Sequence, residues 1–349
     1  MSELRINNIT DTAGSSGPII AGVSTVTSTS HMVMPSGPTE MRGGRGTAIT
    51  LGGYADPSAR SQIDKMVIAT AGNATDFGDI SVARYEGSAC GSATRGFLFG
   101  GLPSTFVIDY VTFSSSGGGA ADFGNLRLGR HAWNAGANDS VRGFVMGGSA
   151  SPTPTGAPRL ASIEVITMAT TGDTSDFGDL TKISRRAAGF SSPTRAIHVT
   201  GRDDPARTKD IQFFTMATKG NAVKFGEATD DRDSFSGAFS SPTRGVYGGG
   251  QGTDTPSTTN AIEFITIASE GNAQDFGDLT VARMSGGGAS SKVRGLFCGG
   301  YAYPGSVVTK DEIDFVTIAS TGNATDFGNL TTVRRNMDAC SDVNGGLGD

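Results

Sequence analysis

The stretch "DFGDLTVARMSGGGASSKVRGLFCGG", residues 275–300, decides the fold because each of its parts recurs along the chain. A Phe-Gly pair recurs at spacings of 46 to 54 residues, at Phe77, Phe123, Phe177, Phe225, Phe276 and Phe327. An Arg-Gly pair, which is Arg-Ala in one copy, recurs out of phase with it, at Arg45, Arg95, Arg142, Arg195, Arg244 and Arg294. The chain therefore contains six sequence repeats, which run from about residue 45 to residue 343.

Each repeat divides into four short segments. An apolar run closed by a Gly pair comes first, as in "RGFLFGG" (95–101), and an alternating segment follows, as in "AIEFITIAS" (261–269). A Gly-Asn turn then leads into a third segment, as in "GNATDFGDI" (72–80), and a run of small residues, as in "YEGSACGSAT" (85–94), completes the repeat. Alternation with period 2 and a high Gly content favour strands over helices. Four strands in a unit of about 50 residues predict one blade of a β-propeller.

We therefore predict an all-β protein, a six-bladed β-propeller of four-stranded blades. The predicted units lie near residues 45–94, 95–141, 142–194, 195–243, 244–293 and 294–343. The segment "MDACSD" (337–342) matches the small-residue segment that precedes each Arg-Gly pair. We expect it to pair with the strand that begins at Arg45, because this pairing closes the ring without an exposed edge.

Residues 1–44 lie outside the repeats, whereas residues 45–349 form the predicted propeller. The N-terminal segment is polar and has only two short apolar patches, so it cannot bury a core of its own. We predict an extended arm that is ordered by contact with a partner. The candidate docking residues are Ile19, Ile20, Met32, Val33 and Met34.

The composition excludes several classes of function. The net charge is −6 and no basic block stands out, so we expect no nucleic-acid partner. No run of 18 apolar residues exists, so we expect no membrane insertion. Cys90, Cys298 and Cys340 lack CxxC spacing and do not cluster with the three histidines, which predicts free buried thiols and no metal or other cofactor.

The triplet Asp76-Phe77-Gly78 matches the magnesium-binding motif of protein kinases, but its repetition argues for a structural role. The acid recurs in five of the six repeats, and Lys224 replaces it in the remaining one. A catalytic metal ligand has no reason to recur in this way, and the other kinase motifs are missing from the sequence. We expect the Phe side chain to fill the space between blades and the Gly to permit a turn, and we predict no enzyme activity.

A second arginine series recurs at Arg84, Arg130, Arg185, Arg232, Arg283 and Arg334. One interpretation is a ring of positive charge that binds an anion on the propeller axis. The other is that the arginines of both series pair with a repeated acid, such as Asp76 or Asp79, and link neighbouring blades. We favour the second interpretation because Arg and Asp recur together in nearly every repeat.

Specific contacts should lie where the repeats differ, which is in the loops that follow the Gly pairs. These loops span 54–60, 149–160, 202–209, 250–260 and 301–310, and we expect them to gather on one face. The candidate residues for binding a partner protein or a glycan are Tyr54, Asp56, Arg159, Asp203, Asp204, Asp254, Tyr301 and Tyr303. We interpret Trp133, His131 and His198 as structural.

The Gly pair and the period near 50 make the repeats similar to kelch-type propellers, although each repeat lacks the kelch tryptophan. Residues 275–300 more closely resemble the Gly/Ser-rich repeats in structural proteins of tailed bacteriophages, especially marine cyanobacterial phages. The arm also resembles the N-terminal leaders of such virion proteins. This resemblance implies a non-enzymatic virion protein, present in multiple copies on a tail, fibre or capsid. The protein would be made in the host cytoplasm and would end up in the virion. Its arm would bind other virion proteins there.

Two alternatives stay open. The first is a carbohydrate-binding propeller whose variable loops contact host surface polysaccharide, or a host surface protein. The second is a hydrolase with a site in the central channel, which requires carboxylates or histidines that converge there and break the sixfold pattern.

Overall fold

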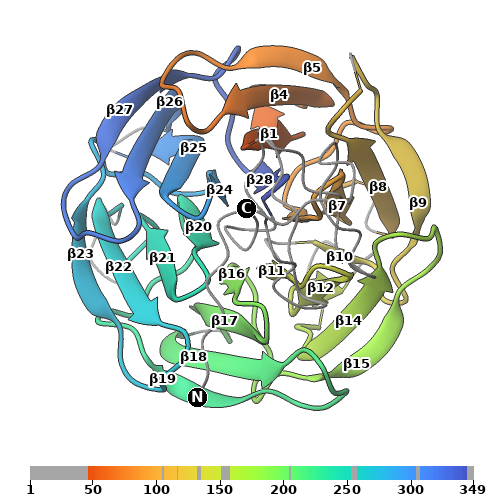
Figure 1. Cartoon of the computed structure of the whole chain (residues 1–349), viewed down its shortest axis with the longest axis vertical. Coiled ribbons are helices and arrows are strands. Elements are labelled where there is room, and N and C mark those ends of the chain that lie inside the picture. Colours follow the sequence, from red (N-terminus) through yellow and green to blue (C-terminus); the bar gives the residue numbers. More distant parts are fainter. Residues whose placement is uncertain are drawn as a thin grey trace, which may run out of the picture. The chain divides into compact units, whose positions relative to one another are not determined.

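Six four-stranded antiparallel sheets follow one another around a central axis in the computed structural model (Figure 1). The structure describes residues 46–103, 106–115, 117–131, 135–150, 158–203, 206–252, 258–303 and 307–343, and none of these residues is helical. The chain divides into Met1–Glu40 and a compact unit, Met41–Asp349, that contains every described residue. Outside the described residues lie Ile19, Ile20, Met32, Val33, Met34, Arg45, Trp133, Asp204 and Asp254. The predicted six-bladed β-propeller is confirmed.

Each blade has four strands, which follow one another from the axis outward. Blade one contains β28 (Asp338–Ser341), β1 (Thr47–Leu51), β4 (Gln62–Val67) and β5 (Thr75–Asp79). Blade two contains β6 (Ser88–Gly91), β7 (Arg95–Phe99), β8 (Val107–Thr112) and β9 (Ala121–Asn125). Blade three contains β11 (Ala135–Asn138), β12 (Arg142–Met146), β14 (Ser162–Thr167) and β15 (Ser175–Asp179).

The remaining blades follow the same order. Blade four contains β16 (Ala188–Ser191), β17 (Arg195–Arg202), β18 (Arg207–Thr215) and β19 (Val223–Glu227). Blade five contains β20 (Gly237–Ser240), β21 (Arg244–Gly248), β22 (Ala261–Thr266) and β23 (Gln274–Asp278). Blade six contains β24 (Gly287–Ser290), β25 (Arg294–Ala302), β26 (Val308–Thr317) and β27 (Thr325–Asn329). Two short pairs join the loops, β2 (Tyr54–Ala55) with β3 (Ser58–Ala59) and β10 (Arg130–His131) with β13 (Ser149–Ala150).

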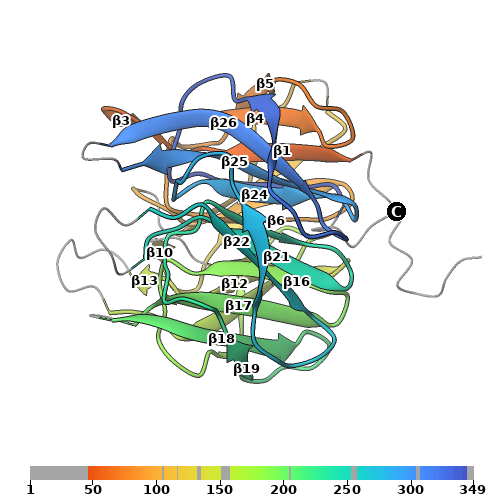
Figure 2. The ribbon, with the colours of Figure 1, turned by 90° about the vertical axis from the view of Figure 1, so that its left-hand side faces the viewer.

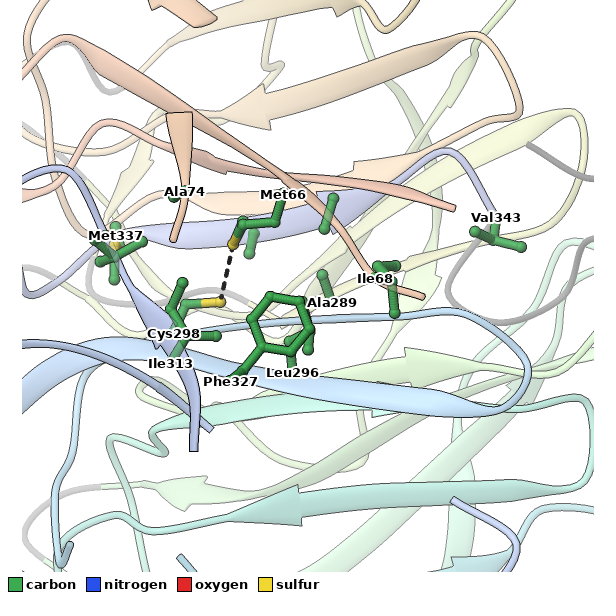
Figure 3. Close-up of a cluster of buried hydrophobic side chains, with 13 residues drawn as sticks. Met66, Ile68, Ala74, Ala289, Leu296, Cys298, Ile313, Phe327, Met337 and Val343 are labelled. Carbon is green, nitrogen blue, oxygen red and sulfur yellow. Dashed lines mark hydrogen bonds between the residues drawn. The ribbon is translucent and has the colours of Figure 1, made fainter. Parts of the chain in front are cut away.

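The two ends of the propeller meet in blade one. The innermost strand β28 pairs antiparallel with β1, with Ala48 opposite Ser341 and Leu51 opposite Asp338. The predicted closure by residues 337–342 is therefore confirmed. Apolar side chains of blades six and one pack against each other beside this closure, where Met66 and Cys298 point toward one another with their sulfur atoms 4.0 Å apart (Figure 3). All three cysteines are free and buried, as expected.

The repeated Asp-Phe-Gly triplets form an outer belt that joins each blade to the next. The carbonyl oxygen of Phe77 accepts a hydrogen bond from the N–H of Gly118, which precedes the outer strand of blade two, at 3.0 Å. Gly78 has a φ of +144°, and a Cβ at this position would lie 2.5 Å from the carbonyl oxygen of Gly118. Because the Phe77 ring is buried and the Asp76 side chain is exposed, Phe and Gly carry the structural role of the triplet. The structural interpretation of this motif is confirmed.

A buried arginine joins one blade to the next at five of the six blade junctions, all of which fall within the described residues. Each guanidinium lies against a buried carboxylate on the third strand of the following blade. The pairs are Arg84–Asp109, Arg130–Glu164, Arg232–Glu263, Arg283–Asp314 and Arg334–Asp64. The N–O separation is 2.8 Å for the first pair and 2.6 Å for the last. These pairs link blades rather than forming an anion-binding ring on the axis.

The partners predicted for these arginines were wrong. Asp76 and Asp79 are exposed on the outer strand, where water already solvates their carboxylates. The partner in each pair is instead a polar residue of the alternating third strand, which is buried because each blade packs between two neighbours. Alternation indicated that these residues face away from the apolar ones, but it did not show that both faces are covered.

Blade four lacks the arginine–carboxylate pair. Ser184 occupies the position of the buried arginine, whereas Arg185, which was predicted to belong to the series, lies one residue further along the chain. Gln212 occupies the position of the acid and accepts hydrogen bonds from the N–H and the hydroxyl of Thr181, at 2.7 and 2.8 Å. His198 lies opposite Gln212 on β17 and is 1% exposed.

The other arginine series links blades through carbonyl oxygens. Arg95 donates to the carbonyl oxygens of Met168 and Ala169 in the next blade, at 3.0 and 3.1 Å. Arg142 differs, because it pairs with Asp139 of its own blade at 2.7 Å. The expected linking role is confirmed for Arg95, Arg195, Arg244 and Arg294, but the expected carboxylate partner is wrong for them.

Candidate functional site on the loop face

One face of the propeller carries the loops that follow the Gly pairs, and we call it the loop face. The short strands β3, β10 and β13 lie along it, at the left of Figure 2. Two positions of each repeat meet on this face. The residue that follows the buried-arginine position lies across strands from the residue that follows the Gly pair. We call the resulting set of cross-strand neighbours in each blade a loop-face row.

The six loop-face rows occupy equivalent positions but differ in chemistry. From blade one to blade six they are Arg335–Tyr54–Ala59, Tyr85–Leu102, His131–Ser149–Arg159, Arg185–Arg202–Arg207, Asp233–Gln251–Thr258 and Met284–Tyr301–Thr309. Gly pairs fix these positions, because Gly52 and Gly53 adopt φ values of +59° and +115° and turn the chain onto the face. The scaffold repeats, whereas the surface it presents changes from blade to blade.

Arg335 joins the rows of blades one and six. Its guanidinium lies 5.0 Å from the ring centre of Tyr54 and 5.4 Å from that of Tyr301, which are cation–π distances. Two hydrogen bonds of 3.0 Å bind the same guanidinium to both carboxylate oxygens of Asp56, and a third of 3.0 Å reaches Thr309. Burial raises the pKa of Tyr301, so its hydroxyl stays protonated. The cluster is a polar and aromatic platform at the blade junction.

A cleft of about 610 Å³ opens beside this platform, between blades six and one. Its volume lies in the range of small-ligand sites. Exposed apolar side chains form part of the wall, and polar groups in the lining supply hydrogen-bonding atoms. The lining residues are Ala55, Asp56, Arg60, Gln62, Val307, Val308, Thr309, Thr332 and Val333.

The structure brings together some of the residues predicted for binding and separates others. Tyr54, Asp56 and Tyr301 converge on Arg335, whereas Tyr303 is 42% exposed and stands outside the cluster. Arg159 belongs to the row of blade three.

Asp203 follows the row residue Arg202 in blade four. Sequence reasoning missed Arg335, Arg202 and Arg207. The Arg-Arg doublet at 334–335 was the signal that could have indicated Arg335, because the scaffold needs only one arginine there.

The central channel is narrow, with a volume of about 90 Å³, enough for a few water molecules. The six innermost strands line it mainly with small residues. Serine hydroxyls tie neighbouring strands together, as where Ser240 donates to the carbonyl oxygen of Ser191 at 2.6 Å and Ser341 to that of Ser290 at 2.6 Å. These bonds link the inner strands of neighbouring blades around the channel.

Asp338 is the only acidic residue among the described residues that line the channel. The equivalent positions in the other blades hold Ser, Ala or Gly. Its carboxylate accepts hydrogen bonds from the N–H groups of Ala89 and Ala339, at 2.7 and 2.8 Å. Burial raises the pKa of Asp338 to about 7. The several converging carboxylates or histidines that a channel hydrolase requires are not among the described lining residues.

His131 and His198 have separate structural surroundings. The imidazole of His131 lies 3.6 Å from the carboxylate of Glu86 at the loop face. Burial lowers the pKa of His198 to about 4, so the ring is neutral inside blade four. Among the described residues, no group of three or more His, Cys, Asp or Glu side chains is suitably placed to hold a metal ion.

The fold and the loop face define the class of protein: a β-propeller with a repeating scaffold and one variable face, which can serve in ligand binding or protein–protein interaction. No helix in the described part of the chain is long and apolar enough to span a membrane. The chain matches no known family model and no curated protein.

Proposed function

We propose that the protein is a non-enzymatic structural component of a tailed-phage virion, attached through its N-terminal arm and used in assembly or host-surface contact. The observation that carries the proposal is the division between a sixfold scaffold and a single varied face. Residues that repeat are used to join blades, as the buried Arg84–Asp109 and Arg334–Asp64 pairs illustrate. The face that differs from blade to blade is then free to recognise a partner.

Two features of the sequence support the virion assignment. The repeat in residues 275–300 resembles the repeats of phage structural proteins, and the polar segment 1–44 resembles their N-terminal leaders. A rigid propeller on a polar arm is suited to display on a particle, because the arm can supply the attachment while the loop face stays available. We infer that the protein is present in several copies per particle.

Deletion of residues 2–40 tests the attachment. We expect the shortened protein to keep its thermal unfolding midpoint, because the deleted residues lie outside the blades, and to be lost from purified particles. Immunoblotting of particles against a host-cell lysate measures this loss. A matched control is the full chain with Arg335→Ala, which should be incorporated normally. Normal incorporation of the deletion variant would refute docking by the arm.

A second candidate function is binding of a glycan at the junction of blades six and one. It is favoured by the cleft of about 610 Å³ next to the platform of Tyr54, Tyr301 and Arg335. Aromatic rings and planar polar groups are suited to the apolar faces and hydroxyls of sugars. A glycan array probed with the full chain tests it, and we expect Gln62→Ala, in the cleft wall, to reduce any signal. Absence of binding across host-type polysaccharides would rule out this candidate.

A further inference from the structure

Arg60 differs from the other basic residues because its side chain has no partner. Every other lysine and arginine in the described part of the chain makes a hydrogen bond, an ion pair or a ring contact, whereas the exposed Arg60 guanidinium makes none. Its main chain is held on both sides. The Arg60 N–H donates to the carbonyl oxygen of Gly53 at 2.8 Å, and its carbonyl oxygen accepts from the N–H of Arg84 at 3.3 Å. The loop of blade one therefore presents a single unpaired positive charge from a hydrogen-bonded backbone.

This charge lines the cleft of about 610 Å³ between blades six and one. Asp56 is the only acid among the described lining residues, and Arg335 already binds both of its carboxylate oxygens. The buried Arg334 nearby is balanced by Asp64. Burial lowers the pKa of Arg334, and the positive charge of Arg60 lowers it further. Arg60 therefore adds one positive charge to surroundings in which the other charges are paired.

Apolar side chains share the cleft with this charge. Val307, Val308 and Val333 line it and are 45%, 42% and 45% exposed. The first two lie at the start of β26 in blade six, whereas Val333 lies in the connection between β27 and β28. Aliphatic side chains that stay exposed together in one cleft are typical of a contact surface. A ligand that fits this cleft has an apolar face next to a negative charge.

Two threonine hydroxyls in the lining have hydrogen-bonding capacity left. The Oγ1 atom of Thr309 accepts a hydrogen bond from Arg335 at 3.0 Å, so its O–H can still donate. The Oγ1 atom of Thr332 donates to Oε1 of Gln62 at 3.0 Å, so its oxygen can still accept. A sugar hydroxyl can both donate and accept, and it can therefore bind either threonine.

We propose that this cleft binds a uronic-acid residue of a glycan, whose carboxylate lies against Arg60. The threonines bind its hydroxyls, and the valines cover its C–H face. The two coplanar oxygens of a carboxylate match the guanidinium fork. Arg335 binds Asp56 in this way beside the cleft. The proposal names the substrate class for the second candidate function, glycan binding at this junction, and rests on it.

The experiment measures binding of the full chain to galacturonate and mannuronate trimers by calorimetry, over a series of salt concentrations. The fully methyl-esterified galacturonate trimer is the neutral counterpart, and a triglutamate peptide supplies the same charge without a sugar. We expect the wild type to bind at least one acidic trimer, with an affinity that falls as salt rises. The methyl ester should bind about tenfold more weakly or not at all.

Replacement of Arg60 tests the role of its charge. Arg60→Thr introduces the residue of the equivalent positions in blades four and five, Thr208 and Thr259, so the scaffold accommodates it. It should weaken binding of the acidic trimer by about tenfold or more. Arg60→Lys keeps the charge without the fork and should recover part of the loss. The control Arg127→Thr removes the same charge from an exposed side chain outside the cleft and should stay within about threefold of the wild type.

A second pair of variants adds a negative charge. Val333→Asp introduces the residue of the equivalent position in blade five, Asp231, and places a carboxylate in the cleft wall. It should weaken binding of the acidic trimer by about tenfold or more. The control Val82→Asp introduces the blade-five residue Asp230 at an exposed position outside the cleft, and it should stay within about threefold.

Four results would overturn the proposal: no binding of either acidic trimer at low salt, equal affinity for the methyl ester, equal losses in the Arg60→Thr and Arg127→Thr variants, or tighter binding of the triglutamate peptide. The comparison of trimer with ester needs no variant, so it holds even if a variant unfolds. Equal affinity for the ester would leave glycan binding intact and remove only the carboxylate assignment. A glycan array without any signal would instead refute glycan binding itself, and incorporation into particles is scored separately because it depends on the arm.

Discussion

Blades four and six solve the same packing problem in different ways. In blade six the guanidinium of Arg283 lies 3.1 Å from the carboxylate of Asp314, and both are buried. In blade four Ser184 and Gln212 occupy these positions, and neutral His198 takes the place of Phe297. Gln212 and Asp314 each accept two hydrogen bonds from a threonine, so the neutral and the charged junction share one bonding pattern. The scaffold therefore tolerates loss of the charge when both partners are lost together.

The largest expected effect comes from splitting the pair in blade six. Arg283→Ser leaves the carboxylate of Asp314 buried without its cation, and we expect a loss of about 3–5 kcal/mol in unfolding free energy. The double variant Arg283→Ser with Asp314→Gln reproduces the blade-four arrangement and should lose less than half as much. Urea denaturation of the three proteins gives these values.

The matched control is Ser184→Ala in blade four, which removes one hydrogen bond to the carbonyl oxygen of Thr200. It should cost about 1 kcal/mol. The single variant Arg283→Ser could instead prove as stable as the double variant. That result would show that the two charges act independently, and it would contradict the idea that blade four tolerates loss of the charge because both partners are lost together.

The next largest loss of stability is expected in the outer belt, which blade four shares with the other blades. Gly78→Ala places a Cβ against the carbonyl oxygen of Gly118 at a φ of +144°, and we expect it to cost about 1–3 kcal/mol. Gly72→Ala is the control, because a Cβ at that position has no neighbour within 4 Å. Thermal unfolding of both variants measures the difference, and equal midpoints would contradict the tight packing of the belt.

A smaller effect is the pH dependence of the unfolding free energy. It differs in sign between Asp338, in the channel at blade one, and His198, inside blade four. The folded state holds the Asp338 proton up to a pKa of about 7, against 3.8 unfolded, so this group makes stability fall as pH rises from about 4 to 7. The folded state keeps His198 neutral down to a pKa of about 4, against 6.5 unfolded, so this group makes stability fall as pH drops from about 6.5 to 4. The two slopes oppose each other between pH 4 and 6.5.

Single variants should separate these slopes. Asp338→Ala introduces the residue of the equivalent position in blade four, and its unfolding midpoint should rise with pH more steeply than that of the wild type. His198→Leu introduces the residue of blade two, and its midpoint should rise less steeply or fall. Thermal unfolding from pH 4 to 7.5 tests both, and profiles parallel to the wild type would exclude these two groups as the cause.

The smallest expected effect is that of Lys224→Asp, which restores the outer acid that blade four lacks. The Lys224 side chain is 59% exposed and pairs with Glu227 on the surface. We expect no measurable change in the unfolding midpoint, because water solvates either charge at this position. A marked rise in the midpoint would show that the acid of the triplet has a structural role after all.

The fold was predictable from the sequence because propeller blades are local in the chain. Spacing alone placed the strands of each repeat, and the match between "MDACSD" and the small-residue segments predicted the closing strand. The partners of the buried arginines were not predictable, because Asp109 and Asp76 look alike in sequence and only packing between blades makes one of them buried. The loop-face rows were missed for a related reason: Arg202 and Arg207 are separated along the chain from Arg185, and only the strand register brings them together.

The closing strand has a consequence for biosynthesis. β28 is the last strand of the propeller to be translated, yet it is the innermost strand of the first blade. Until residues 338–341 leave the ribosome, β1 presents an unpaired inner edge, and the nascent chain holds five complete blades beside a three-stranded one. An open edge of this kind can pair with other chains, so the protein is most exposed to misassembly in the interval before β28 emerges.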